Sequence, residues 1–139
     1  MLKERSKFLL VGTVCNSLLA LFGIISIIFV FMQLVGIGLY DEVYATEEFV
    51  QMGFIAMLIQ TGYLLLGSFM TLNGILSIIG FIRKNNDLLL VSIILSAVIS
   101  ILYLIIVPTY GLWGFLVLFI TFVLMLIGYI KENKNSNSK

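Results

Sequence analysis

Few residues of this chain carry side chains that are typical of catalytic or metal sites. Its 139 residues include no His, one Cys (Cys15) and only seven Asp and Glu in total. Without His there is no imidazole for acid–base catalysis or metal ligation, and a single Cys closes no intramolecular disulfide. The sequence therefore predicts a protein that is not an enzyme and that uses no cofactor or metal.

The side chains that remain as candidates for polar contacts are uncharged and lie in apolar stretches. They are Asn16, Gln33, Gln60, Tyr63 and Asn73. A carboxamide in an apolar environment is costly unless it is hydrogen-bonded. We expect these side chains to bond between packed helices; the alternative is that the four carboxamides line a cavity for a lipid or small molecule.

The chain around these residues is too apolar for a soluble domain. Apolar residues make up 61% of it and charged residues 11%, against about 45–50% and about 25% in soluble proteins. The charged residues leave three uncharged tracts, 8–40, 49–82 and 88–130. A membrane-spanning helix needs about 20 residues, so the third tract is long enough for two spans, with a turn at Pro108–Gly111.

The predicted fold is an all-α membrane protein, an antiparallel bundle of four transmembrane helices in a single domain over residues 1–130. The expected spans are about 8–34, 53–82, 88–107 and 112–130. An outer acidic loop is expected over about 35–52, with a helix end at Val35–Gly38, and a frayed cytoplasmic tail over 131–139.

Basic residues set the orientation of such a bundle. All eight Lys and Arg lie in the N-terminal segment, the 83–87 turn or the C-terminal tail. Four spans put these three segments on one side of the membrane, so we expect a multi-pass protein of the cell membrane with both termini cytoplasmic. Asn16 and Asn73 then lie toward the inner half of the bilayer and Gln33 and Gln60 toward the outer half, which favours two separate polar pairs.

Small and polar residues recur along the second span at a helix-packing interval. Gly53, Gln60, Gly67 and Gly74 are each seven residues apart. Small residues let helix backbones approach closely in a membrane, so this stripe is expected to face a neighbouring helix.

Four acids without a basic residue mark the expected outer loop: Asp41, Glu42, Glu47 and Glu48. One interpretation is a charge bias that keeps the loop outside and soluble; the other is a docking site for a cationic partner or a divalent ion. No Asp, Glu, Lys or Arg occurs inside an expected span, which argues against an ion-coupled transporter.

Two spans end in a similar way at the inner surface, in Gly80-Phe81-Ile82-Arg83 and Gly128-Tyr129-Ile130-Lys131. With this topology the chain resembles the small four-span integral membrane proteins of low-GC Gram-positive bacteria, a group whose function is unknown. The resemblance covers most of the chain and implies no catalytic residue.

Two functional hypotheses follow from these features. The first is a non-enzymatic membrane protein that acts by helix–helix or protein association in the bilayer, as an accessory subunit or an immunity-type protein. The second is a protein that binds a lipid or small molecule, or forms a permeation pathway, within the helix bundle. The expected partners are membrane lipids and either another membrane protein or a second copy of the chain. Nucleic acid is not expected as a partner.

Overall fold

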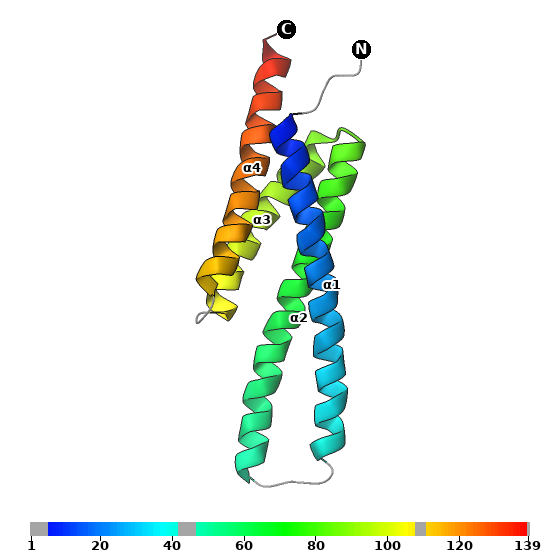
Figure 1. Ribbon diagram of the computed structural model, residues 1–139, viewed down its shortest axis with the longest axis vertical. Coiled ribbons are helices and arrows are strands. Elements are labelled where there is room, and N and C mark those ends of the chain that lie inside the picture. Colours follow the sequence, from blue (N-terminus) through cyan, green and yellow to red (C-terminus); the bar gives the residue numbers. More distant parts are fainter. Residues whose placement is uncertain (1–5, 42–46, 108–110, 139) are drawn as a thin grey trace.

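The computed structural model describes residues 6–41, 47–107 and 111–138, and within them residues 34, 36–41 and 47–52 by their backbone alone. In these ranges the chain forms four α-helices, α1 (Lys7–Asp41), α2 (Glu47–Ile82), α3 (Asn86–Ile106) and α4 (Gly111–Asn137) (Figure 1). Each helix is long and apolar enough to cross a membrane. The all-helical, four-helix class is therefore the one that the sequence predicts.

Two segments differ from the expectation. Residues 35–41 and 47–52, predicted as an outer loop, belong to α1 and α2, so the Gly-containing segment Val35–Gly38 does not end the first helix. Residues 131–137, predicted as a frayed tail, continue α4 to Asn137. The reason in both cases is that nothing in these segments breaks a helix that is already formed: they contain no Pro, and extending a helix costs much less than starting one.

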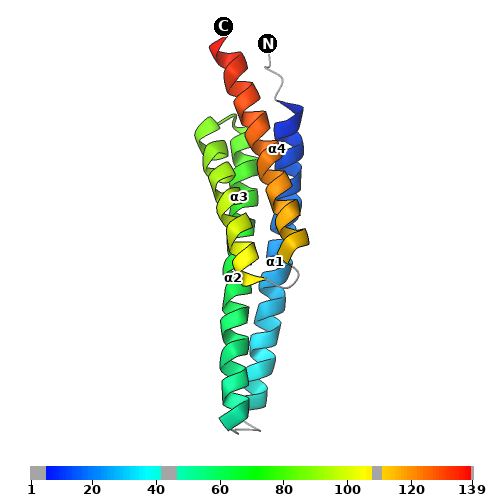
Figure 2. The same cartoon turned by 90° about the vertical axis from the view of Figure 1, so that its left-hand side faces the viewer.

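The helices form a ring in which each packs against two neighbours. The contacting pairs are α1 with α2, α2 with α3, α3 with α4, and α4 with α1. The first turn of α1, the α2–α3 turn and the last turns of α4 lie at one end of the molecule (Figures 1 and 2). We call this the charged end, because Lys7, Arg83 and Lys131 lie there.

The four helices differ in length at both ends of the molecule: α4 extends beyond the others at the charged end, and α1 and α2 extend beyond α3 and α4 at the opposite end (Figures 1 and 2). All four helices pack together only along part of the molecule, which we call the four-helix section. It runs along α2 from Gly80, which packs against Leu89 near the charged end, to Gly62, which packs against Ile106 where α3 ends. From there α1 and α2 continue alone as a pair (Figures 1 and 2). We call residues 34–41 and 47–59 of this pair the extension; from Gly62 to Glu47, α2 runs about 22 Å at 1.5 Å per residue.

The turn at the charged end is built by hydrogen bonds that cap both helices. Lys84 has a positive φ of 53°, and its N–H donates to the carbonyl of Phe81, while the N–H of Asn85 donates to the carbonyl of Gly80. This pattern is the Schellman motif that ends helices. The side chain of Asn85 then accepts from the backbone N–H groups that open α3 and acts as its N-cap.

Close approach of α1 and α2 depends on glycine. A Cβ on Gly23 would lie 2.6 Å from the carbonyl oxygen of Gly67, and a Cβ on Gly67 would lie 2.8 Å from that of Gly23. Gly74 similarly faces Ala20. The seven-residue stripe of α2 thus faces α1 from Gln60 to Gly74, whereas Gly53, in the extension, has open space around it.

Candidate functional site

A buried polar network joins all four helices in the middle of the four-helix section. Its centre is Asn73 of α2, which is 3% exposed. The Asn73 amide Nδ2 donates to the hydroxyl of Ser96 at 2.8 Å and to Oδ1 of Asn16 at 3.4 Å. Its Oδ1 accepts from the hydroxyl of Ser92 at 2.7 Å. Both polar atoms of this carboxamide are therefore satisfied inside the bundle.

The network reaches α4 through a sulfur atom. Nδ2 of Asn16 donates to Sδ of Met125 at 2.8 Å, and the hydroxyl of Ser77 donates to the same sulfur at 3.8 Å. Met125 is fully buried. Sequence reasoning missed this acceptor, because methionine usually serves as apolar filling and a thioether accepts only weakly.

The space beside the network is too small for a ligand. The void lined by Asn16, Asn73, Ser96 and their apolar neighbours measures about 10 Å³. A single water needs at least about 10–15 Å³ on this kind of measure. Apolar clusters flank the network, with Leu9, Leu89 and Ile93 on the side of the charged end. Asn16 and Asn73 thus bond to neighbouring helices around a void of about the size of one water.

The other carboxamides form a second pair at the level where α3 ends. Nε2 of Gln60 donates to Oε1 of Gln33 at 3.1 Å. Gln60 is 8% exposed, and its own Oε1 is buried with no hydrogen-bond partner among the residues that the structure describes. This pair joins α1 to α2 and, unlike the Asn73 network, leaves one acceptor unsatisfied.

Tyr63 lies in the wall of a cavity. The inner cavity, of about 310 Å³, has walls from all four helices that include Leu19, Phe22, Leu66, Tyr103 and Val117. The outer cavity, of about 420 Å³, lies along α1 and is lined by Ile25, Phe29, Val30 and Gln33. Ser26 and Tyr63 line both cavities, which are therefore adjoining. Tyr63 was expected to bond across a helix interface; its hydroxyl has no partner among the residues that the structure describes.

The structure does not describe the side chains of the four acids of the expected outer loop. Glu42 is outside the described residues, and Asp41, Glu47 and Glu48 are described by their helical backbone only. Over the ranges 6–33, 53–107 and 111–138, whose side chains are described, no group of three or more His, Cys, Asp or Glu comes together, and Cys15 is a half-buried free thiol. Comparison of the chain with protein-family models, with curated proteins and with solved structures finds no match.

Proposed function

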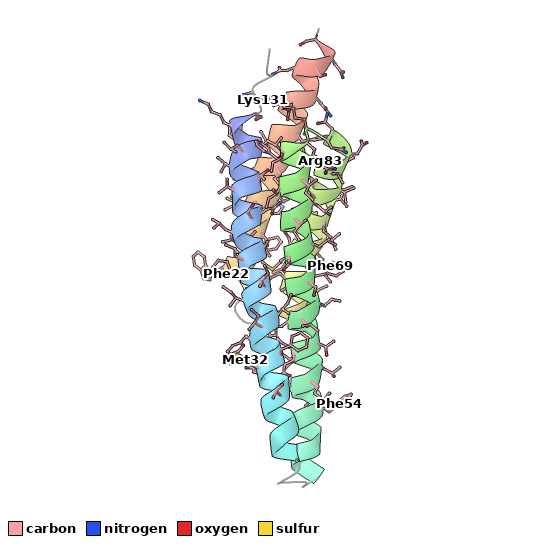
Figure 3. All side chains as sticks on the ribbon, turned by 90° about the vertical axis from the view of Figure 1, so that its right-hand side faces the viewer. Phe22, Met32, Phe54, Phe69, Arg83 and Lys131 are labelled. Atoms are coloured by element: carbon pink, nitrogen blue, oxygen red, sulfur yellow. The ribbon has the colours of Figure 1, made fainter. Side chains whose placement is uncertain are left out.

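We propose that the protein is a non-enzymatic integral membrane protein that works by association in the bilayer, with another membrane protein or with a second copy of itself, as an accessory subunit or an immunity-type protein. Its four helices cross the cell membrane as an antiparallel bundle with both termini in the cytoplasm. Arg83 and Lys131 lie at the same end of the molecule (Figure 3), which supports this orientation because Lys and Arg favour the cytoplasmic side.

The length of the shortest helix, α3, indicates which part of the molecule the hydrocarbon core of the bilayer surrounds. From Gly80 to Gly62 the four-helix section is about 27 Å long, close to the roughly 30 Å of a hydrocarbon core. The uncharged part of α2, 34 residues or about 51 Å, fits the same core only with a tilt above about 50°, beyond the usual range of about 0–40°. The extension is therefore expected to project past the outer surface of the hydrocarbon.

The observation that carries the proposal is the apolar surface of this extension. Five large apolar side chains of α2 in the extension are more than half exposed: Phe54, Ile55, Met57, Leu58 and Ile59. Val35 of α1 is 65% exposed, and Met32 and Phe54 project outward from the helix pair (Figure 3). Each such side chain contributes about 1.5–3 kcal/mol when it is removed from water, which favours a partner that covers the extension.

Charge indicates what kind of partner fits. Asp41 ends α1, and Glu47 and Glu48 begin α2, at the tip of the extension. The sequence between these helix ends contains a fourth acid, Glu42, and no basic residue. Two copies would bring eight negative charges together, whereas a partner with cationic groups at the outer surface gains complementary attraction. We therefore favour a heterologous partner with an apolar helix and a basic outer end over a second copy.

Cross-linking from single cysteines tests the proposal. In a Cys15→Ala background, Phe54→Cys places a thiol on the extension, and Ile82→Cys places one at an exposed position (72%) at the charged end of α2, also outside the hydrocarbon core, as a control. Cells are treated with a membrane-permeant bifunctional maleimide, and the product is purified in mild detergent and identified by mass spectrometry. We expect one protein of fixed stoichiometry to be captured through Phe54→Cys and not through Ile82→Cys.

Two results contradict the proposal. If Phe54→Cys captures nothing above the level of Ile82→Cys, the extension has no protein partner. If both positions capture the same broad set of proteins, the contacts are random encounters in the membrane. A cross-linked dimer of the chain itself supports association but contradicts the preference for a cationic partner.

A further inference from the structure

The adjoining cavities around Ser26 and Tyr63 have the form of a lipid site. We infer that they bind one acyl chain of a glycerophospholipid from the leaflet nearest the extension, with the ester carbonyls of the lipid at the hydroxyl groups of Ser26 and Tyr63. The inference rests on the membrane setting proposed above but requires no protein partner.

Size and position are the first argument. At about 310 and 420 Å³ the two cavities lie in the usual range for ligand pockets, roughly 300–1,000 Å³. The inner cavity lies within the four-helix section, and its walls include Leu19, Leu66 and Leu118. The outer cavity reaches Gln33, which pairs with Gln60 at the end of α3. The space therefore runs from the apolar interior of the bundle to the level of the expected membrane surface.

The distribution of polar groups gives the ligand a direction. Deep in the bundle the inner cavity ends at apolar walls beside the satisfied Asn73 network. Toward the extension it meets the hydroxyls of Ser26 and Tyr63 and then the carboxamide of Gln33. A lipid in the nearer leaflet has the same order, with its chains pointing to the midplane and its ester and headgroup region outward. The inner cavity, the two hydroxyls and Gln33 thus follow the order of acyl chain, ester and headgroup in a lipid, although apolar Ile25, Phe29 and Val30 also line the outer cavity.

Unsatisfied donors identify the chemistry of the polar part. Most helix hydroxyls of this chain donate to the carbonyl four residues earlier: those of Thr13, Ser17, Thr61, Ser68, Thr71, Ser96, Ser100 and Thr121. Within the described part of the chain the hydroxyls of Ser26 and Tyr63 have no acceptor, and neither has that of Tyr103 on the wall of the inner cavity. A donor in an apolar wall is costly unless an acceptor reaches it, and ester carbonyls are acceptors without a competing donor.

At the outer end of the space a second polar group lacks a partner. Gln60 is only 8% exposed, and its Oε1 receives no hydrogen bond from any residue that the structure describes. Its hydrogen-bond partner Gln33 lines the outer cavity. Gln60 itself lines neither cavity, so the carboxamide that a bound lipid reaches at this level is that of Gln33. Phosphatidylglycerol, whose headgroup hydroxyls can bond to a carboxamide, is the probe.

The test compares an ester lipid with its ether analogue. The purified protein is titrated in mild detergent with dioleoyl phosphatidylglycerol, or with the dialkyl ether form that keeps chains and headgroup and lacks the carbonyls, and bound lipid is counted by native mass spectrometry. We expect one tightly bound ester lipid per chain and binding of the ether form weaker by about threefold for each lost hydrogen bond. Equal binding of both lipids would overturn the inference.

Variants locate the site. The double variant Ser26→Ala/Tyr63→Phe should lose the preference for the ester lipid, whereas Ser68→Ala and Tyr129→Phe, which remove the same groups outside the cavity walls, should keep it. Ser26→Leu, which fills the space that the cavities share, should lose the bound lipid altogether. If Ser26→Leu has wild-type helicity and still retains the lipid, the lipid does not bind in these cavities. The same follows if Ser68→Ala or Tyr129→Phe loses the preference for the ester lipid.

The lipid comparison on the wild-type chain decides the inference even if a variant does not fold. Its outcome is also separable from that of the proposed function, because it uses the isolated protein, while the cross-linking experiment reads contacts at Phe54 on the extension.

Discussion

Replacing Asn73 by leucine should destabilise the bundle, because Asn73 connects α2 to both α1 and α3. The change removes three hydrogen bonds, to Ser96, Asn16 and Ser92, and puts a larger, apolar side chain beside a void of only about 10 Å³. Interhelical hydrogen bonds in membranes contribute about 0.6 kcal/mol each, so losing three lowers the free energy of unfolding by about 2 kcal/mol, and overpacking lowers it by about 1–3 kcal/mol more. Unfolding by SDS in mixed micelles, followed by circular dichroism, measures it.

The matched control is Gln60→Leu. Gln60 is buried to a similar degree but makes one side-chain hydrogen bond and holds one unsatisfied acceptor. Losing the bond costs about 0.6 kcal/mol, and removing a buried unpaired polar atom gains about 1–3 kcal/mol. The free energy of unfolding of Gln60→Leu should therefore equal that of the wild type or exceed it by up to about 2 kcal/mol.

A double-mutant cycle separates the network from general packing. Asn73→Leu combined with Ser92→Ala should show a coupling energy of about 0.6 kcal/mol, because the two side chains share one bond at 2.7 Å. If Asn73→Leu is no more destabilising than Gln60→Leu, or if the coupling is zero, the network does not hold the helices together and the reasoning is refuted.

Three further changes test the packing and the turn. Gly23→Ala places a methyl group against the backbone of α2 and should destabilise by about 1–3 kcal/mol, while Gly53→Ala, in open space, should show no loss in the same SDS titration. Lys84→Gly puts a residue without a Cβ at the positive φ of the turn and should stabilise the protein by roughly 0.5–1 kcal/mol in that titration. A loss of stability would show that Lys84 is not strained at this φ. Asn85→Ala removes the N-cap of α3 and should cost about 1 kcal/mol, and an unchanged midpoint would show that the cap contributes nothing.

The number and approximate limits of the helices could be predicted because charges and one proline divide the chain. Uncharged tracts separate the clusters of charged residues, and α3 ends at Ile106, just before Pro108. The lengths at the helix ends could not be predicted. Gly36 and Gly38 suggested a helix end by the rules of soluble proteins, but in α1 the backbone bonds continue through them to Asp41.

The polar pairs could be predicted in part. Depth along the spans separates Asn16 and Asn73 from Gln33 and Gln60, and the structure joins them in these two pairs. The role of Met125 left no signal in the sequence, since any apolar residue of α4 would look the same. The cavity at Tyr63 could not be predicted either, because it depends on where the short α3 and α4 end relative to α1 and α2.

The central claim is that four helices cross the membrane with the charged end in the cytoplasm, and cysteine accessibility tests it most directly. In the Cys15→Ala background, Thr46→Cys, Asn86→Cys and Ser138→Cys leave every charge unchanged. Intact cells are treated with a membrane-impermeant maleimide before and after permeabilisation. The account predicts labelling of Thr46→Cys in intact cells and of Asn86→Cys and Ser138→Cys only after permeabilisation; labelling of Asn86→Cys or Ser138→Cys from outside would contradict it.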